Sequence, residues 1–306
     1  MEWLLEAYDH SLEKEMLDAV SQETPWKLVE YFSRLRRDSG TKGERKAASY
    51  IARQLSRMGI PHQVYEPELF LSVPQWAKLE IVSPSHVEIQ CKTPSFSHST
   101  EGETIEGSLV YISMEAGDKA EYILDSGVRD IPHDVEGKIV LTEGVFGPQI
   151  AWELESRGAI GQIYIHPGSL IHESIISTIW GTPTLDNMNR IPKTPVVSVN
   201  QPDGQKLRDL CKTGQPRVAL QTKLSVGWSR CPVPVAEIRG KDEPEKFILI
   251  HGHYDAWHFG VGDNATGNAA CLELARIFHT HRDQLFRSAR VAWWPGHSSG
   301  RYAGST

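Results

Sequence analysis

Residues 247–263 read FILIHGHYDAWHFGVGD, and this stretch decides the fold. Its first four residues are apolar without a helical period and are soon followed by a glycine, which predicts a strand buried on both faces of a parallel or mixed sheet. Ligands of open α/β sheets bind beyond the carboxyl ends of the strands. The polar side chains that follow this strand are those of His253, Asp255, His258 and Asp263. We therefore expect the functional site at the end of this strand.

The same residues carry the chemistry of a metal site. In an extended segment His253 and Asp255 point to the same side, because they are two positions apart. A neutral imidazole is a good zinc ligand, and a nearby carboxylate fixes its tautomer or helps to hold the ion. Asp263 precedes a segment with helical period, where its carboxylate could bridge two ions. The alternative is that His-x-Asp is only a surface pair or part of the core, as such short motifs commonly are.

A longer pattern runs through residues 252–276, with GHYD, then GDNATG, then LELAR. It resembles the co-catalytic zinc aminopeptidase family that includes glutamate carboxypeptidase II. The resemblance implies that His253 binds one zinc ion and that Asp263 bridges two. It also implies that Asp255 supports the site as a catalytic residue. A member of this family would be an exopeptidase that hydrolyses peptide bonds near a chain terminus, of the aminopeptidase or the carboxypeptidase type, with two zinc ions in the complete enzyme.

The chain departs from that family after the next apolar segment, residues 288–294. The family has two successive glutamates there, a general base and a zinc ligand, and this chain has Gly296, His297 and Ser298. Histidine binds zinc and can act as a base near neutral pH, so His297 is a candidate replacement for either glutamate. The alternative is a polar loop residue in a protein that has lost the chemistry. The family's remaining ligands come from later segments, so we expect an incomplete catalytic domain.

The chain divides into three parts by its pattern of apolar, polar and turn-forming residues. Residues 1–70 favour helices, one of which opens with capping-box spacing at Thr41 and Glu44, and they are assigned to the peptidase domain. Residues 71–230 are short apolar runs separated by turn residues, which predicts a β-rich domain. Part of this region resembles a protease-associated domain, an insert of the larger family members. Residues 231–306 are assigned to the metal-site half of the peptidase domain, truncated.

The expected fold is therefore α/β, a mixed-sheet zinc-exopeptidase catalytic domain, incomplete, with an inserted β-rich protease-associated domain. The sheet is expected to be mixed because a short polar turn, residues 240–244, separates the strand at 233–238 from the one at 247–250. Strands joined in this way are predicted to be antiparallel neighbours.

Charge, hydropathy and cysteine spacing limit the classes of partner that the chain is expected to bind. The 306-residue chain has a net charge of −7, which gives no basis for nucleic-acid binding, since that needs a basic face. It has no apolar run of membrane-spanning length. Its four cysteines are widely spaced, which argues against a zinc finger or a disulfide scaffold. Free thiols and an acidic N-terminus without a signal pattern favour a cytoplasmic location. A peptide is the expected partner, and a homodimer is left open.

Three functions remain at this level. The first is the zinc exopeptidase with two ions. The second is a mononuclear hydrolase that uses His253, Asp263 and His297 around a single ion. The third is a non-catalytic relative or incomplete fragment that acts as a binding module after losing the two glutamates.

Overall fold

The computed structural model describes residues 10–113, 134–143 and 147–305. The chain divides into two compact units. Unit 1 contains the described residues up to Leu69 together with Ser229–His297 and Ser305. Unit 2 contains Phe70–Trp228 and Ser298–Gly304. The sequence placed the inserted domain at residues 71–230.

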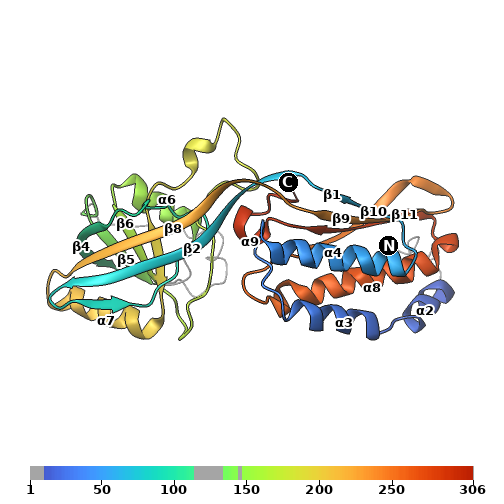
Figure 1. Ribbon diagram of the computed structural model, residues 1–306, viewed down its shortest axis with the longest axis horizontal. Helices are drawn as coiled ribbons and strands as arrows, with labels where there is room; N and C mark the ends of the chain where they lie inside the picture. Colours follow the sequence, from blue (N-terminus) through green and yellow to red (C-terminus); the bar gives the residue numbers. More distant parts are fainter. Residues whose placement is uncertain (1–9, 114–133, 144–146, 306) are drawn as a thin grey trace, which may run out of the picture. The chain divides into compact units, whose positions relative to one another are not determined.

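Unit 1 is built on a four-stranded mixed sheet in the order β1-β9-β11-β10 (Figure 1). The strands, in that order, are β1 (His62–Tyr65), β9 (Val233–Ile238), β11 (Arg287–Trp294) and β10 (Glu243–His253). The first three pair in antiparallel fashion, whereas β11 and β10 are parallel. The predicted mixed sheet is therefore present.

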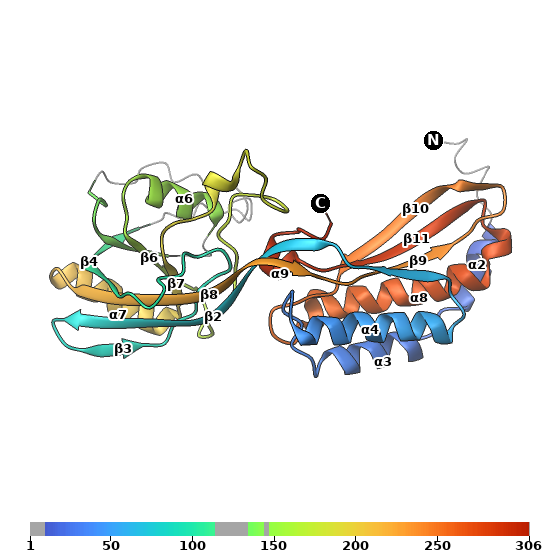
Figure 2. The same cartoon turned by 45° about the horizontal axis from the view of Figure 1, so that its top comes forward.

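The helices of unit 1 include α2 (His10–Asp18), α3 (Glu23–Phe32), α4 (Lys42–Arg57), the π-helical turn η2 (Val261–Ala265), α8 (Thr266–Thr280) and the 3₁₀ turn η3 (Arg282–Gln284). Helix α4 packs on β1 and β9, α8 packs on β9, β10 and β11, and α3 packs on α8. Figures 1 and 2 show that these three helices lie on the same face of the sheet. Their apolar faces and the sheet form one core, in which Ile51, Leu272 and Trp293 are fully buried.

The prediction that residues 247–250 form a strand buried on both faces is wrong. They belong to β10, which is the edge of the described sheet, and Phe247, Ile248 and Leu249 are 44%, 63% and 45% exposed. An apolar run indicates a strand. It does not specify whether neighbouring elements cover both faces of that strand or whether another strand pairs with its outer edge.

The prediction that the strands before and after residues 240–244 are neighbours is also wrong. Strand β11 lies between β9 and β10, antiparallel to the first and parallel to the second. The chain leaves β10, runs through α8 and returns as β11 into the space beside β9. A short turn fixes the opposite direction of two strands, but it does not prevent a third from pairing between them.

Unit 2 contains a seven-stranded mixed sheet in the order β3-β2-β8-β4-β5-β6-β7. Its strands are β2 (Glu68–Ser83), β3 (Val87–Ile89), β4 (Ile105–Ile112), β5 (Ile139–Glu143), β6 (Gly161–Ile165), β7 (Val196–Val199) and β8 (Arg217–Arg230). Its helices are α6 (Pro148–Ser156), α7 (Gln201–Thr213) and the 3₁₀ turn η1 (Met188–Arg190).

The two faces of this second sheet bury separate cores. Alternate residues of a strand point to opposite faces. In β5, Ile139 and Leu141 face the core that includes Leu207 of α7, while Val140 faces the core that includes Leu154 of α6. Within the described ranges of the chain, no helix has both the length and the apolar character that crossing a membrane requires.

Candidate metal centre

The strand order of unit 1 explains why two histidines far apart in the sequence meet. His253 is the last residue of β10, and its register partner on the parallel strand β11 is Trp294. His297 follows three residues later, at the start of α9 (His297–Gly300). Parallel neighbours end at the same edge of a sheet, so both side chains lie beyond that edge. Their rings stack with centroids 3.8 Å apart.

Asp263 reaches the same place from the segment before α8. It lies in η2 (Val261–Ala265), a π-helical turn in which Asp263 itself has non-helical φ and ψ, and its peptide bond to Asn264 is cis. The Asp263 Oδ1 atom is 2.9 Å from Nε2 of His253. Its side chain is 69% exposed, so this carboxylate faces solvent while its oxygen contacts the imidazole.

The hydrogen bond made by Nδ1 of His253 determines what its other ring nitrogen, Nε2, can do. Nδ1 lies 3.0 Å from the carbonyl oxygen of Asp255. A carbonyl oxygen can only accept, so Nδ1 donates to it, and in the protonated ring Nε2 donates to the carboxylate of Asp263. When the ring loses the proton on Nε2, the lone pair of that atom becomes available to a metal ion. The carboxylate of Asp255, which is fully buried, lies 3.6 Å from the same Nδ1 atom. This is the arrangement in which metal-binding histidines are commonly oriented.

The electrostatics of the two histidines differ. Burial lowers the pKa of His253, but hydrogen bonds and charge from Asp255 and Asp263 outweigh burial and raise it to about 9. Burial and the charge on His253 lower the pKa of His297. Near neutral pH the metal-free pair therefore holds its proton on His253, and a metal ion bound at Nε2 would replace that proton.

The donor set fits a zinc ion. His253, Asp263 and His297 each offer one ligand atom, and these three atoms lie within 4.8 Å of one another. Catalytic zinc sites use three such nitrogen and oxygen ligands and keep a fourth position open. Asp255 supports the site from behind His253 and is outside this group of three. His258 lies in the exposed part of the loop and is also outside the group.

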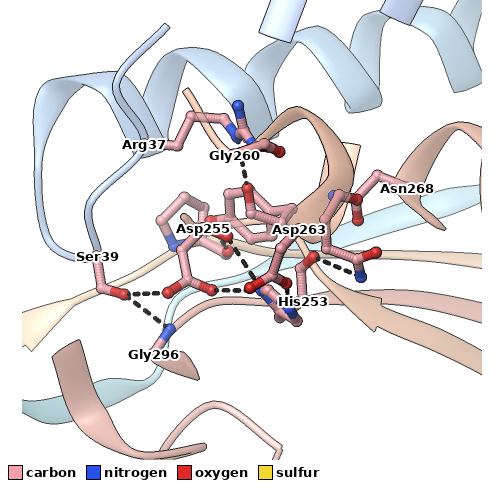
Figure 3. A network of polar contacts seen from close by, with 11 residues as sticks. Arg37, Ser39, His253, Asp255, Gly260, Asp263, Asn268 and Gly296 are labelled. Atoms are coloured by element: carbon pink, nitrogen blue, oxygen red, sulfur yellow. Dashed lines mark hydrogen bonds and ion pairs between the residues drawn. The ribbon is translucent and has the colours of Figure 1, made fainter. Parts of the chain in front are cut away.

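Two residues from the N-terminal part of the chain complete the surroundings (Figure 3). Ser39 Oγ donates to Oδ2 of Asp255 at 2.7 Å and accepts from the backbone amide of Gly296 at 3.1 Å. The buried Arg37 donates to backbone carbonyls in the loop between His253 and Asp263. The sequence predicted no role at the site for either residue. The segment 37–41 resembles the opening of the same peptidase family and leads into the capping box at Thr41, but neither signal indicates a long-range partner.

Two asparagines, one in η2 and one in the first turn of α8, hold the other side of the site. Asn264 Nδ2 donates to the carbonyl oxygen of His253 at 3.3 Å, and Asn268 Nδ2 donates to the carbonyl oxygen of Asn264 at 2.6 Å. A Cβ atom at Gly267 would lie 2.2 Å from the side-chain oxygen of Asn264, so a larger residue there would displace the Asn264 amide from its hydrogen bond to His253.

Solved structures that share this fold include zinc aminopeptidases and related peptidases. The chain aligns with a Peptidase M28 precursor from Shewanella amazonensis with a TM-score of 0.72 and 16% identity, covering 96% of this chain and 69% of that one. It aligns with a zinc aminopeptidase from Bacillus subtilis with a TM-score of 0.65 and 18% identity, covering 89% and 61%. The prediction of an α/β, mixed-sheet fold of the zinc-exopeptidase class is confirmed.

A family model and curated relatives match parts of the chain. Residues 234–303 match Peptidase family M28, and this range includes every candidate site residue named from the sequence. A probable leucine aminopeptidase 2 from Aspergillus oryzae is 22% identical over 265 residues, which are 85% of this chain and 48% of that protein. The chain thus spans about half the length of this relative. The resemblance to a metallopeptidase family, stated from the sequence, is confirmed.

Proposed function

We propose that this chain carries the metal centre of a zinc-dependent exopeptidase. The observation that supports the proposal most strongly is the convergence of His253, Asp263 and His297, from three separate segments, within 4.8 Å of one another. The match of residues 234–303 to Peptidase family M28 supports it independently, as does the fold shared with a zinc aminopeptidase. The substrate would be a peptide, cleaved near one terminus.

In this proposal each residue has one role. His253 binds through Nε2, because Nδ1 is committed to the carbonyl oxygen of Asp255. Asp263 supplies an exposed carboxylate, and His297 takes the ligand position that the family fills with a glutamate. Bound zinc supplies Lewis acidity, which polarises the scissile carbonyl and lowers the pKa of a water molecule. Asp255 orients the imidazole of His253 and balances part of its charge.

The single-ion hydrolase is the second candidate. It is favoured by the number of ligands, because the group contains three residues, which suit one catalytic ion. The number of zinc ions bound per purified chain distinguishes the three candidate functions. One equivalent supports the mononuclear centre, two equivalents support the co-catalytic pair, and none supports the non-catalytic binding module.

Two further proposals concern the whole protein. We propose that unit 2 is a protease-associated domain that shapes access to substrate, on the strength of its β-rich sheet and the resemblance of its sequence. We also propose a cytoplasmic location, because Cys91, Cys211, Cys231 and Cys271 are all free thiols, as is usual in a reducing compartment.

The test of the metal centre is zinc affinity, measured by titration calorimetry on the 306-residue chain. Asp263→Asn keeps the shape of the side chain and removes its charge. We expect zinc binding to weaken by more than the roughly 10- to 100-fold that loss of an outer-shell partner costs. Asp283→Asn, at an exposed aspartate in η3, is the matched control and should bind as the unmodified chain does. Equal affinity in both variants would show that the site lies elsewhere.

A further inference from the structure

Loop 254–262 connects two of the proposed ligands, and it has to follow one path for them to meet. His253 precedes this loop and Asp263 follows it. Gly260 sits in the left-handed region, with φ of 44°, and a Cβ atom there would lie 2.2 Å from Cβ of Ala256. The loop therefore folds back tightly on itself, and its inward carbonyl groups need donors.

One side chain provides those donors. Arg37 is completely buried, and its guanidinium donates to the carbonyl oxygens of Tyr254 at 2.9 Å, Phe259 at 2.6 Å and Gly260 at 2.9 Å. It also donates to the carbonyl oxygen of Phe32, at the end of α3, at 3.0 Å. Only arginine has enough donors in a rigid plane to reach all four groups. The same side chain thus ties both ends of loop 254–262 to one fixed point.

Ser39, two residues after Arg37, makes a second connection between segments of the site. Its buried hydroxyl group joins the Asp255 carboxylate, behind His253, to the amide of Gly296, immediately before His297 (Figure 3). These two hydrogen bonds link the ends of the parallel strands β10 and β11 beyond their last paired residues. The backbone ladder ends at His253 and Trp294, with the amide of Tyr254 donating to the carbonyl oxygen of Trp294. Beyond that point the Ser39 hydroxyl group holds Asp255 at a fixed distance from Gly296, the residue before His297.

We propose that Arg37 and Ser39 are positioning residues of the metal centre. Arg37 sets the path from His253 to Asp263, and Ser39 sets the separation of His253 from His297. This inference rests on the proposed function for the identity of the ligands. It assigns to residues 37–39, more than 200 positions upstream of the site, the task of holding all three ligands in register.

The experiment uses two pairs of variants in the full chain. Ser39→Ala removes the bridging hydroxyl group, and Ser33→Ala is its control, because the hydroxyl group of Ser33 is exposed and bonds only locally to Glu30. Arg37→Lys keeps the positive charge but loses the planar guanidinium group with its several N–H donors. Arg36→Lys, at an exposed neighbouring arginine, is its control.

Two readouts are needed, one with metal and one without. In metal-free protein labelled at histidine, the nuclear Overhauser effect between the ring protons of His253 and His297 reports their spacing directly. Zinc affinity reports the consequence. We expect Ser39→Ala and Arg37→Lys to weaken the ring contact and to lower zinc affinity by about 10- to 100-fold, while both controls match the unmodified chain.

The inference is overturned if Ser39→Ala keeps both the ring contact and the zinc affinity of Ser33→Ala. If Arg37→Lys fails to fold, the serine pair alone decides. A failure of the proposed function gives a different result from a failure of this inference. If the proposed function is wrong, the unmodified chain binds no zinc, but Ser39→Ala still loses the contact between the two histidine rings. The positioning role of Ser39 then stands without the metal.

Discussion

At the scale of single residues, Glu44 is a buried acid that the proposed reaction does not use. It lies in the first turn of α4, fully buried, and its Oε2 accepts from the amide of Gly40 at 2.9 Å. Burial and the nearby charge of Asp255 raise its pKa from 4.5 to about 8. Near neutral pH this carboxyl group therefore keeps its proton in the folded protein.

This gives a pH dependence with a defined sign. Below the unfolded pKa of 4.5 both states bind the proton, and above about 8 neither does. Between them only the unfolded chain ionises, so Glu44 makes the free energy of unfolding fall as pH rises, by on the order of 3–5 kcal/mol. Glu44→Gln should remove that part of the decline, measured by denaturant unfolding between about pH 5 and pH 8.

The control is Glu30→Gln, at an exposed glutamate of α3, which should leave the pH dependence unchanged. The raised pKa of His253 adds a decline of the same sign, so the comparison is made between Glu44→Gln and the unmodified chain. A decline of equal size in these two proteins would contradict the assignment to Glu44.

Sequence reasoning reached the candidate site residues but not their supports. His253, Asp255 and Asp263 lie within one short stretch, so a motif can contain them, and His297 is visible because it stands where the family has a glutamate. Arg37 and Ser39 bind backbone groups more than 200 positions away. Backbone partners leave no pattern in a single sequence, so these contacts become visible only in the folded chain.

At the scale of elements, the exposed edge of β10 is the feature with the clearest consequence. β10 is the outer strand of the sheet in the described part of the chain, and its exposed side chains Phe247, Ile248 and Leu249 mark a strand edge of the kind that pairs with other chains. A lysine on such an edge opposes that pairing. We predict that Ile248→Lys reduces non-specific association of the 306-residue chain, measured by sedimentation velocity.

Leu185→Lys is the matched control, because Leu185 is 95% exposed but lies outside any strand. If both substitutions reduced association equally, general surface hydrophobicity would be the cause, and the edge of β10 would have no special part in it.

The elements also show which sequence signals were reliable. Capping at the start of α4 is as predicted, with the hydroxyl group of Thr41 accepting from the amide of Glu44. That signal is local, and it depends only on the chemistry of a helix terminus. Strand β10 was expected in the middle of a sheet and adjacent to β9. Both errors have the same origin, since pairing is decided by which segment returns to the sheet and not by the strand itself.

At the scale of the whole molecule, the separate cores of the two units predict where zinc should act. The proposed ligands and the core around Leu272 and Val291 belong to unit 1, while the cores around Ile163 and Tyr164 belong to unit 2. Ligand binding stabilises the state that holds it, by about 2.7 kcal/mol at a free concentration of 100 Kd.

Hydrogen exchange should show that stabilisation in one unit. We expect zinc to slow exchange of the core amides of α8 and β11 and to leave those of β6 and β7 unchanged. Equal slowing in both units would mean that they unfold together, and slowing only in unit 2 would place the metal elsewhere.

The boundaries of the units can be compared with the texture of the sequence. The region from 71 to 230 was set apart because its apolar runs are short and punctuated by turn residues. The described strands and helices of unit 2 lie almost entirely within it; β2 begins slightly before it, at Glu68, and β8 ends at its last residue, Arg230. The sequence did not predict α7, although Asn200 caps this helix by accepting from the amide of Asp203. Its identity as a protease-associated domain stays a prediction.

The central claim is that His253, Asp263 and His297 together bind zinc, and a crystal grown with zinc tests it most directly. Anomalous diffraction at the zinc absorption edge locates the ion without reference to the protein coordinates. The account predicts a peak about 2.0–2.2 Å from Nε2 of His253 and from a carboxylate oxygen of Asp263, with a ring nitrogen of His297 as the third ligand. A peak bound by other side chains, or no peak beside His253, would contradict it.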